Sequence, residues 1–186
     1  MMLLPTQAGM VLVRDERDLD SAFSQRAPYL FHQTDGERMW DQGTRSFICS
    51  RRADVFKLWV ALQRYGTNGL AELYDYFCAL TRQMWKAIGE RRDFEALHEP
   101  ECNILCFRWV GEGERNGRAG APALDAVNRE LRERYNASGH GWITATDLDG
   151  RRVLRVTIMN PRTTPAHCRE VVAALIATGR AISAGR

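Results

Sequence analysis

The stretch that decides the fold reads Trp142-Ile-Thr-Ala-Thr-Asp-Leu-Asp-Gly-Arg-Arg-Val-Leu-Arg-Val-Thr-Ile158. Two runs suited to strands, residues 142–146 and 152–158, flank Asp149-Gly150, the dipeptide that a type I′ turn prefers. The sequence therefore predicts an antiparallel hairpin. Because side chains alternate between the faces of a strand, the second run has two sets of residues. One face carries Leu154, Val156 and Ile158, and the other carries Val153, Arg155 and Thr157.

Helical patterns stand on both sides of this hairpin. Pro122 begins a helix at the position that proline favours, and this helix ends near Gly139. Thr164 precedes a proline that opens the final helix, and residues 103–110 fit a buried strand. Strand, helix, hairpin and helix make an α+β module with a short antiparallel sheet. We place this small C-terminal domain at residues 68–186.

Residues 1–67 have a different pattern, which we assign to the tail of a larger domain. Residues 25–52 show no sustained periodicity, as is typical of functional loops. Asp54 can cap a helix over residues 55–65, which Gly66 then ends. This helix has almost no polar face, so we expect it to be buried on most sides.

The composition limits the functional classes. The chain has 186 residues, 45% hydrophobic and 26% charged, which is ordinary globular usage. Its 26 basic and 23 acidic residues form no basic stripe, so nucleic acid is not an expected partner. No stretch reaches eighteen apolar residues, so we expect no membrane span. The apolar run at residues 1–13 has no basic start and no small-residue cleavage pattern, so we interpret it as a buried strand and not as a signal peptide.

The cysteines favour a reducing compartment. They number five and include no CxxC pair, which suits free thiols in a cytoplasmic protein. Cys102 and Cys106 lie four residues apart, on one face of the expected strand. A zinc site needs further ligands, which His98 alone does not supply, so we predict no metal.

Two side chains outside the apolar pattern could carry chemistry. Arg155 lies in the middle of a strand, where it is either a solvent-facing arginine or a guanidinium held rigidly to grip a carboxylate. Tyr29 is either an ordinary packing residue or a phenolic proton donor on a loop. The only lysines, Lys57 and Lys86, fit surface positions better than a catalytic amine.

Taken together, several segments occur in an order and spacing that resemble one enzyme family. The resemblance is to the C-terminal part of group II pyridoxal-phosphate-dependent amino acid decarboxylases, in the glutamate and cysteine sulfinate decarboxylase branch. It covers nearly the whole chain, but less than half of a family member. The segments are 26–32, 40–43, 49–54, 57–59, 65–66, 106–108 and 153–161.

The resemblance implies a fold, a cofactor and three site residues. Residues 1–67 would be the tail of a fold-type I (aspartate aminotransferase-like) large domain, and the chain would begin just after the lysine that binds pyridoxal 5′-phosphate. Tyr29 matches the catalytic tyrosine of a mobile loop that reaches the neighbouring subunit's site. Arg155 matches the arginine that binds the substrate carboxylate. Ser50 stands where the family has a glycine near the cofactor phosphate of the partner subunit, and the serine still offers its N–H there and adds a hydroxyl.

The expected function is pyridoxal-phosphate-dependent decarboxylation of an amino acid within a homodimer, this chain being an incomplete C-terminal part. An acidic substrate such as glutamate, aspartate or cysteine sulfinate is favoured by the branch. The alternative is a non-catalytic piece, either a truncated product or a dimerisation and loop-donating partner of a separately encoded N-terminal half. In both cases we expect the isolated chain to be inactive, because the Schiff-base lysine is missing.

Overall fold

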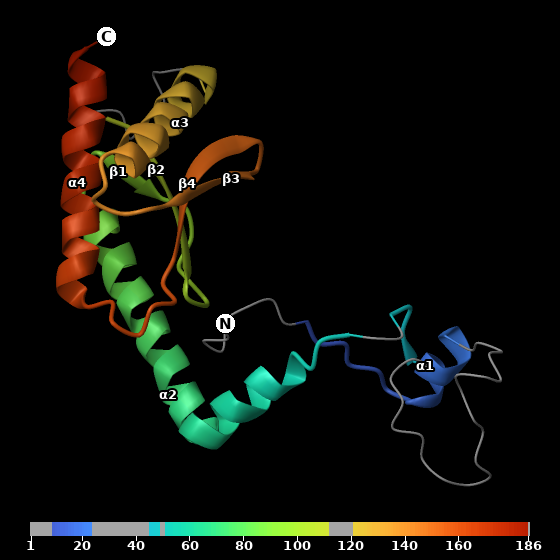
Figure 1. The fold of residues 1–186 in the computed structure, drawn as a ribbon. Helices are drawn as coiled ribbons and strands as arrows, with labels where there is room; N and C mark the ends of the chain where they lie inside the picture. The colour runs from blue at the N-terminus through green and yellow to red at the C-terminus, as the bar shows by residue number, and fades with distance from the viewer. Residues whose placement is uncertain (1–8, 24–44, 49–50, 112–120, 186) are drawn as a thin grey trace, which may run out of the picture. The chain divides into compact units, whose positions relative to one another are not determined.

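A computed structural model describes residues 9–23, 45–48, 51–111 and 121–185 of the chain (Figure 1). The chain divides into two compact units, residues 2–64 and residues 65–186. Helix α1 (Arg17–Ala22) belongs to the first unit, and helix α2 (Val55–Gly89) begins there and continues into the second.

The second unit is an α+β fold, which confirms the predicted class. Its four strands form one antiparallel sheet in the order β1-β2-β4-β3. Three helices accompany the sheet: the later part of α2, then α3 and α4 (Figure 1). The remaining bounds are β1 Phe94–Ala96, β2 Ile104–Trp109, α3 Ala121–Ala137, β3 Thr144–Leu148, β4 Arg151–Thr157 and α4 Pro165–Ala184.

The hairpin forms as its turn predicts. Asp149 and Gly150 both have positive φ, 51° and 72°, as a type I′ turn requires. This two-residue loop pairs Leu148 with Arg151 and fixes the register of β3 on β4. The first strand begins two residues later than predicted, because Thr144 is the first residue that pairs with β4.

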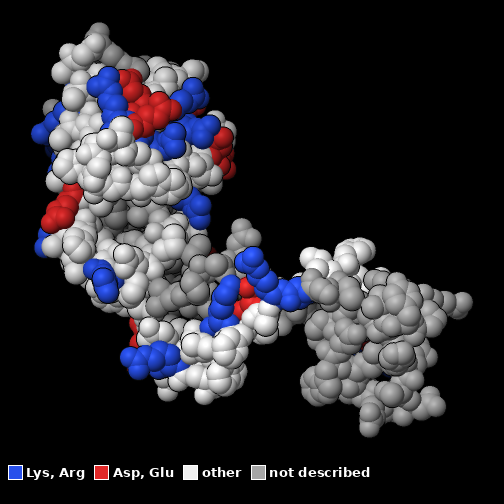
Figure 2. Space-filling model, in the orientation of Figure 1, with Lys and Arg blue, Asp and Glu red and all other residues white. Residues whose placement is uncertain are grey.

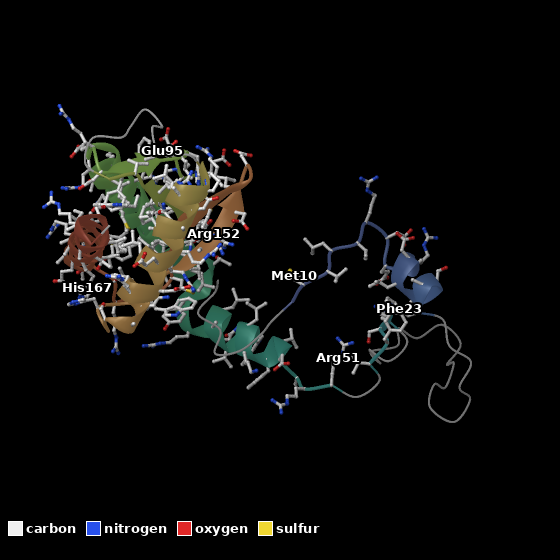
Figure 3. All side chains as sticks on the ribbon, turned by 90° about the horizontal axis from the view of Figure 1, so that it is seen from above. Met10, Phe23, Arg51, Glu95, Arg152 and His167 are labelled. Carbon is white, nitrogen blue, oxygen red and sulfur yellow. The ribbon has the colours of Figure 1, made fainter. Side chains whose placement is uncertain are left out.

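The core of the second unit lies between one face of the sheet and all three helices. Figure 3 shows the side chains that fill this space. The buried cluster takes residues from α2, α3 and α4 together with every second residue of the central strands. Its sheet members include Leu105, Phe107, Trp109 and Leu154. The opposite face therefore carries the alternate residues of β2 and β4, Cys106 and Arg155 among them.

Local sequence signals set the helix ends. Gly66 has non-helical geometry, with φ of 65° and ψ of 176°, and it interrupts α2 where the sequence predicts a stop. The Thr164 hydroxyl accepts a hydrogen bond from the His167 backbone N–H, and the His167 ring accepts one from the Thr164 N–H. This capping box begins α4 at the predicted proline.

Three features of the sequence prediction are wrong. The helix over residues 55–65 is not buried on most sides, since Phe56 and Trp59 are 60% and 54% exposed and stack on each other. Residues 10–13 form no strand and are exposed, because the described part of residues 2–64 offers them no neighbouring strand. Strand β1 was not predicted, since three residues give too short a pattern to recognise.

Candidate functional site

Arg155 lies at the centre of the sheet. Strand β4 runs between β2 and β3, and Arg155 faces Cys106 on β2 and Thr144 on β3. The Thr144 hydroxyl donates a hydrogen bond of 3.0 Å to the Arg155 carbonyl oxygen, which ties the two strands together at this row. The half-buried Arg155 side chain therefore starts from a backbone held on both sides.

Strand β4 carries three arginines, and their partners differ. Arg151 lies 3.3 Å from a carboxylate oxygen of Glu95, and Arg152 lies 3.2 Å from one of Asp147. Arg155 makes no ion pair with any residue of the described part of the chain. Its guanidinium is thus the one on this strand that the described residues leave open to an external anion.

Side chains of helix α3 form hydrogen bonds with the end of β2 and the beginning of β4. The buried Asn128 amide accepts a hydrogen bond from the Trp109 N–H and donates one to the Trp109 carbonyl, both 2.9 Å long. Asp125 accepts from the Arg152 backbone N–H at 3.0 Å and from the buried Arg108 guanidinium at 2.5 Å. The pairing of β2 with β4 stops at Phe107 and Leu154. Beyond that row, these α3 side chains are the hydrogen-bond partners of the strand backbones.

Charges of both signs meet over the second unit. Lys and Arg side chains adjoin Asp and Glu side chains on the face in view (Figure 2), so no extended patch of one sign forms there. The local environment of Arg155 differs, because its two cross-strand neighbours are a thiol and a hydroxyl. Burial raises the pKa of the Cys106 thiol, and the positive charge of Arg155 opposes that rise.

The two lysines lie in other surroundings. Lys57 forms an ion pair of 2.5 Å with Asp54, three residues earlier on the chain. Lys86 is exposed near the end of α2, beside an open cavity of about 400 Å³. That cavity is lined by Trp85, Lys86, Gly89, Glu90, Ala96, His98 and Glu99 and does not include Arg155.

Two predicted site residues, Tyr29 and Ser50, lie outside the described residues. Within the described ranges, no group of three or more His, Cys, Asp or Glu side chains is arranged to hold a metal ion. None of the helices in the described part combines the length and apolarity that crossing a membrane requires.

Sequence reasoning missed the surroundings of Arg155. The alternation in β4 gives the face of Arg155 correctly, but the residue opposite it depends on which strand pairs with β4. That pairing joins residues 104–107 to residues 154–157, about fifty positions apart. The one usable signal is the Asp149-Gly150 turn, which fixes Thr144 as a neighbour once the hairpin register is known.

Comparison with known proteins identifies related sequences. A family model described as the pyridoxal-dependent decarboxylase conserved domain matches residues 1–110. Acidic amino acid decarboxylase GADL1 of Mus musculus is 37% identical over 112 residues, which cover 59% of this chain and 20% of that protein. Cysteine sulfinic acid decarboxylase of Mus musculus is 32% identical over 162 residues, which cover 83% of this chain and 33% of that protein.

A solved structure agrees with these sequence matches. The apo form of mouse CSAD superposes with a TM-score of 0.74 at 26% identity, covering 87% of this chain and 34% of that one. The chain thus spans between a fifth and about a third of the length of these relatives.

Proposed function

Because the chain belongs to the pyridoxal-dependent decarboxylase family, we propose that it takes part in removing carbon dioxide from an amino acid and that Arg155 holds a carboxylate of that substrate. One observation carries the role of Arg155. Among the three arginines of β4, Arg151 and Arg152 have carboxylate partners, and Arg155 has none among the described residues.

The geometry of β4 suits this role. A guanidinium binds a carboxylate through two parallel hydrogen bonds, which fix the orientation of the bound group as well as its position. Arg155 starts from a strand bonded on both sides, so its backbone does not have to be ordered when the substrate binds. A substrate held in this way is oriented so that its scissile bond faces the group that reacts with it.

The family name implies pyridoxal phosphate, which supplies the electron sink for decarboxylation when bound. The chain's own lysines do not fit that cofactor, which is held through a lysine amine. Lys57 is engaged by Asp54, and Lys86 is exposed on the rim of a cavity that also carries Glu90 and Glu99. We therefore infer that the lysine comes from sequence outside these 186 residues. The chain then acts as one part of the enzyme.

The similarity to GADL1 and to cysteine sulfinic acid decarboxylase favours an acidic amino acid as substrate. Glutamate, aspartate and cysteine sulfinate are the proposed candidates. Each carries a second acidic group besides the carboxylate that leaves. We also propose a cytoplasmic homodimer, in which Tyr29 donates a proton to the substrate carbon and Ser50 approaches the cofactor phosphate of the partner subunit. These roles rest on the resemblance of the surrounding segments.

The second candidate function is a non-catalytic one, in which the chain is a truncated product or lends its loop and its dimer surface to a separately encoded half. The surroundings of Lys57 and Lys86 favour this second candidate, because neither lysine offers an amine suited to the cofactor. An assay can separate the two candidates. Carbon dioxide release from each acidic amino acid is measured for the chain with pyridoxal phosphate, alone and with a polypeptide supplying the rest of the family domain.

We expect release only from the mixture, and borohydride should trap the cofactor on neither Lys57 nor Lys86. Stoichiometric trapping on either lysine, together with turnover by the chain alone, would show that the lysine assignment is wrong. If the mixture assembles and releases nothing from any amino acid, the non-catalytic candidate is favoured.

Within the active mixture, Arg155→Lys keeps the charge but loses the two-point grip. The Michaelis constant for the substrate should rise by about tenfold or more, since charge-assisted hydrogen bonds contribute about 1.5–3 kcal/mol. Cofactor affinity should change little. Arg151→Lys on the same strand is the matched control, and it should leave the Michaelis constant unchanged because Arg151 is paired with Glu95. Equal effects of the two variants would assign Arg155 to the solvent face.

A further inference from the structure

Cys106 and Arg155 form a particular class of cross-strand pair. The Ile158 N–H donates a 3.0 Å hydrogen bond to the Asn103 carbonyl, so these two residues form a hydrogen-bonded pair at the end of the β2–β4 ladder. Pair types alternate along an antiparallel ladder. Cys106 and Arg155 lie three rows further on and are therefore a non-hydrogen-bonded pair. In this class the side chains approach each other most closely.

The two side chains also interact electrostatically. Cys106 is only 7% exposed, and the charge of Arg155 acts on its thiol. At another row of the sheet, the residue opposite an arginine carries a carboxylate. Arg152 faces Asp147 on β3 and forms an ion pair with it. A carboxylate at position 106 would meet Arg155 in the same manner.

We propose that Cys106 is a positioning residue for Arg155: its short, uncharged side chain fills the cross-strand position from which a carboxylate would neutralise the guanidinium. Arg155 thereby keeps its charge for the substrate carboxylate. The proposal rests on the proposed function of Arg155 and adds a second residue that determines how strongly the site binds anions. Thr144, the neighbour on the other side, is likewise uncharged and is engaged with the Arg155 backbone.

The first test uses charge at position 106. In Cys106→Asp, the introduced carboxyl should titrate about one pKa unit lower than in the double variant Cys106→Asp with Arg155→Gln. Carbonyl carbon NMR of the intact 186-residue chain measures both values. Equal pKa values in the single and double variants would overturn the proposal, because they would show that the two side chains do not interact.

A second measurement needs no change at position 106 and so does not depend on whether the aspartate variant folds. The Cys106 thiol is titrated through its β-carbon NMR signal in the wild-type chain and in Arg155→Gln. Removal of the positive charge should raise the thiol pKa further, whereas Arg151→Gln should not move it. An unchanged thiol pKa in Arg155→Gln would contradict the proposed contact.

The third test connects the pair to anion binding. L-Glutamate is titrated into the chain at constant ionic strength, with chloride as the balancing anion, while the backbone amide signals of residues 105–107 and 154–156 are followed. Cys106→Asp should bind about tenfold more weakly than Cys106→Asn, which matches it in size but carries no charge. If Arg155→Gln binds as well as the wild-type chain, the proposed function of Arg155 is wrong. If Arg155→Gln loses binding while the two Cys106 variants bind equally, that function stands and the role of Cys106 is overturned.

Discussion

Gly179 of α4 lies directly against the indole of Trp109 on β2. A Cβ atom at Gly179 would stand 2.5 Å from the nearest ring atom, closer than real Cβ contacts allow. Trp109 is 1% exposed and packs edge-on against Phe94, so the ring has little room to move. The absence of a side chain at one helix position therefore sets how closely α4 approaches the sheet.

Gly179→Ala should destabilise the second unit by about 1–3 kcal/mol through overpacking, despite the better helix propensity of alanine. Urea unfolding followed by tryptophan fluorescence measures the change. Gly69→Ala is the matched control, since Gly69 is also helical and a Cβ there would meet only ordinary contacts, the nearest at 3.5 Å. A Gly179→Ala chain as stable as the Gly69→Ala chain would show that α4 and Trp109 adjust freely.

Asn128→Ala should cost at least about 2 kcal/mol of unfolding free energy, because it leaves both backbone groups of Trp109 buried without partners. Hydrogen exchange at the Trp109 amide should accelerate together with this loss. Asn160→Ala is a control at an exposed asparagine, whose side chain accepts a 2.9 Å hydrogen bond from the Arg162 N–H, and it should cost about 1 kcal/mol or less because water can replace that bond. Unchanged protection of the Trp109 amide would show that α3 is not needed to close this end of the sheet.

Acid should weaken the fold through Asp93. Burial alone would raise the pKa of Asp93, but two hydrogen bonds from Arg91, 2.8 and 2.7 Å long, outweigh it and hold that pKa below its usual value. The stabilisation is thus complete above the unfolded pKa of about 3.9 and is lost as pH falls through the lower folded value.

Asp93→Asn tests this pH dependence. The variant should be about 1–3 kcal/mol less stable than the wild type at pH 7, and the difference should shrink toward pH 2–3. Urea midpoints at a series of pH values measure it. A difference that stays constant between pH 7 and pH 2 would show that ionised Asp93 adds no stability.

Tyr29→Phe should slow amine formation by about 10²–10⁴-fold in the active mixture and leave substrate affinity nearly unchanged, because phenylalanine keeps the ring but has no transferable proton. Rapid-quench assays separate the release of carbon dioxide from the formation of amine. Mixed dimers in which one subunit has Tyr29→Phe and the other lacks the cofactor lysine should partly regain activity. Failure of such dimers to recover would place Tyr29 in its own subunit's site or outside catalysis.

Local signals predicted the hairpin, the α4 cap and the interruption at Gly66, since each depends on residues a few positions apart. Burial in the first unit could not be predicted in the same way. The apolar pattern of Phe56 and Trp59 indicates that the side chains suit a core, but it does not say which residues cover them. The same limit applies to the site. Alternation assigns Arg155 to its face, whereas the choice of Cys106 as its neighbour comes from strand order in the folded sheet.

The two-residue turn at Asp149 and Gly150 fixes the register of the hairpin, so the hairpin does not tolerate a change in the length of this turn. Adding or deleting one residue between Leu148 and Arg151 would shift β4 by one position, and every side chain on it would exchange faces. Arg155 would then enter the apolar core, and Leu154 would take its place on the opposite face of the sheet. The length of this turn therefore decides which face of the sheet carries the side chain five positions beyond it.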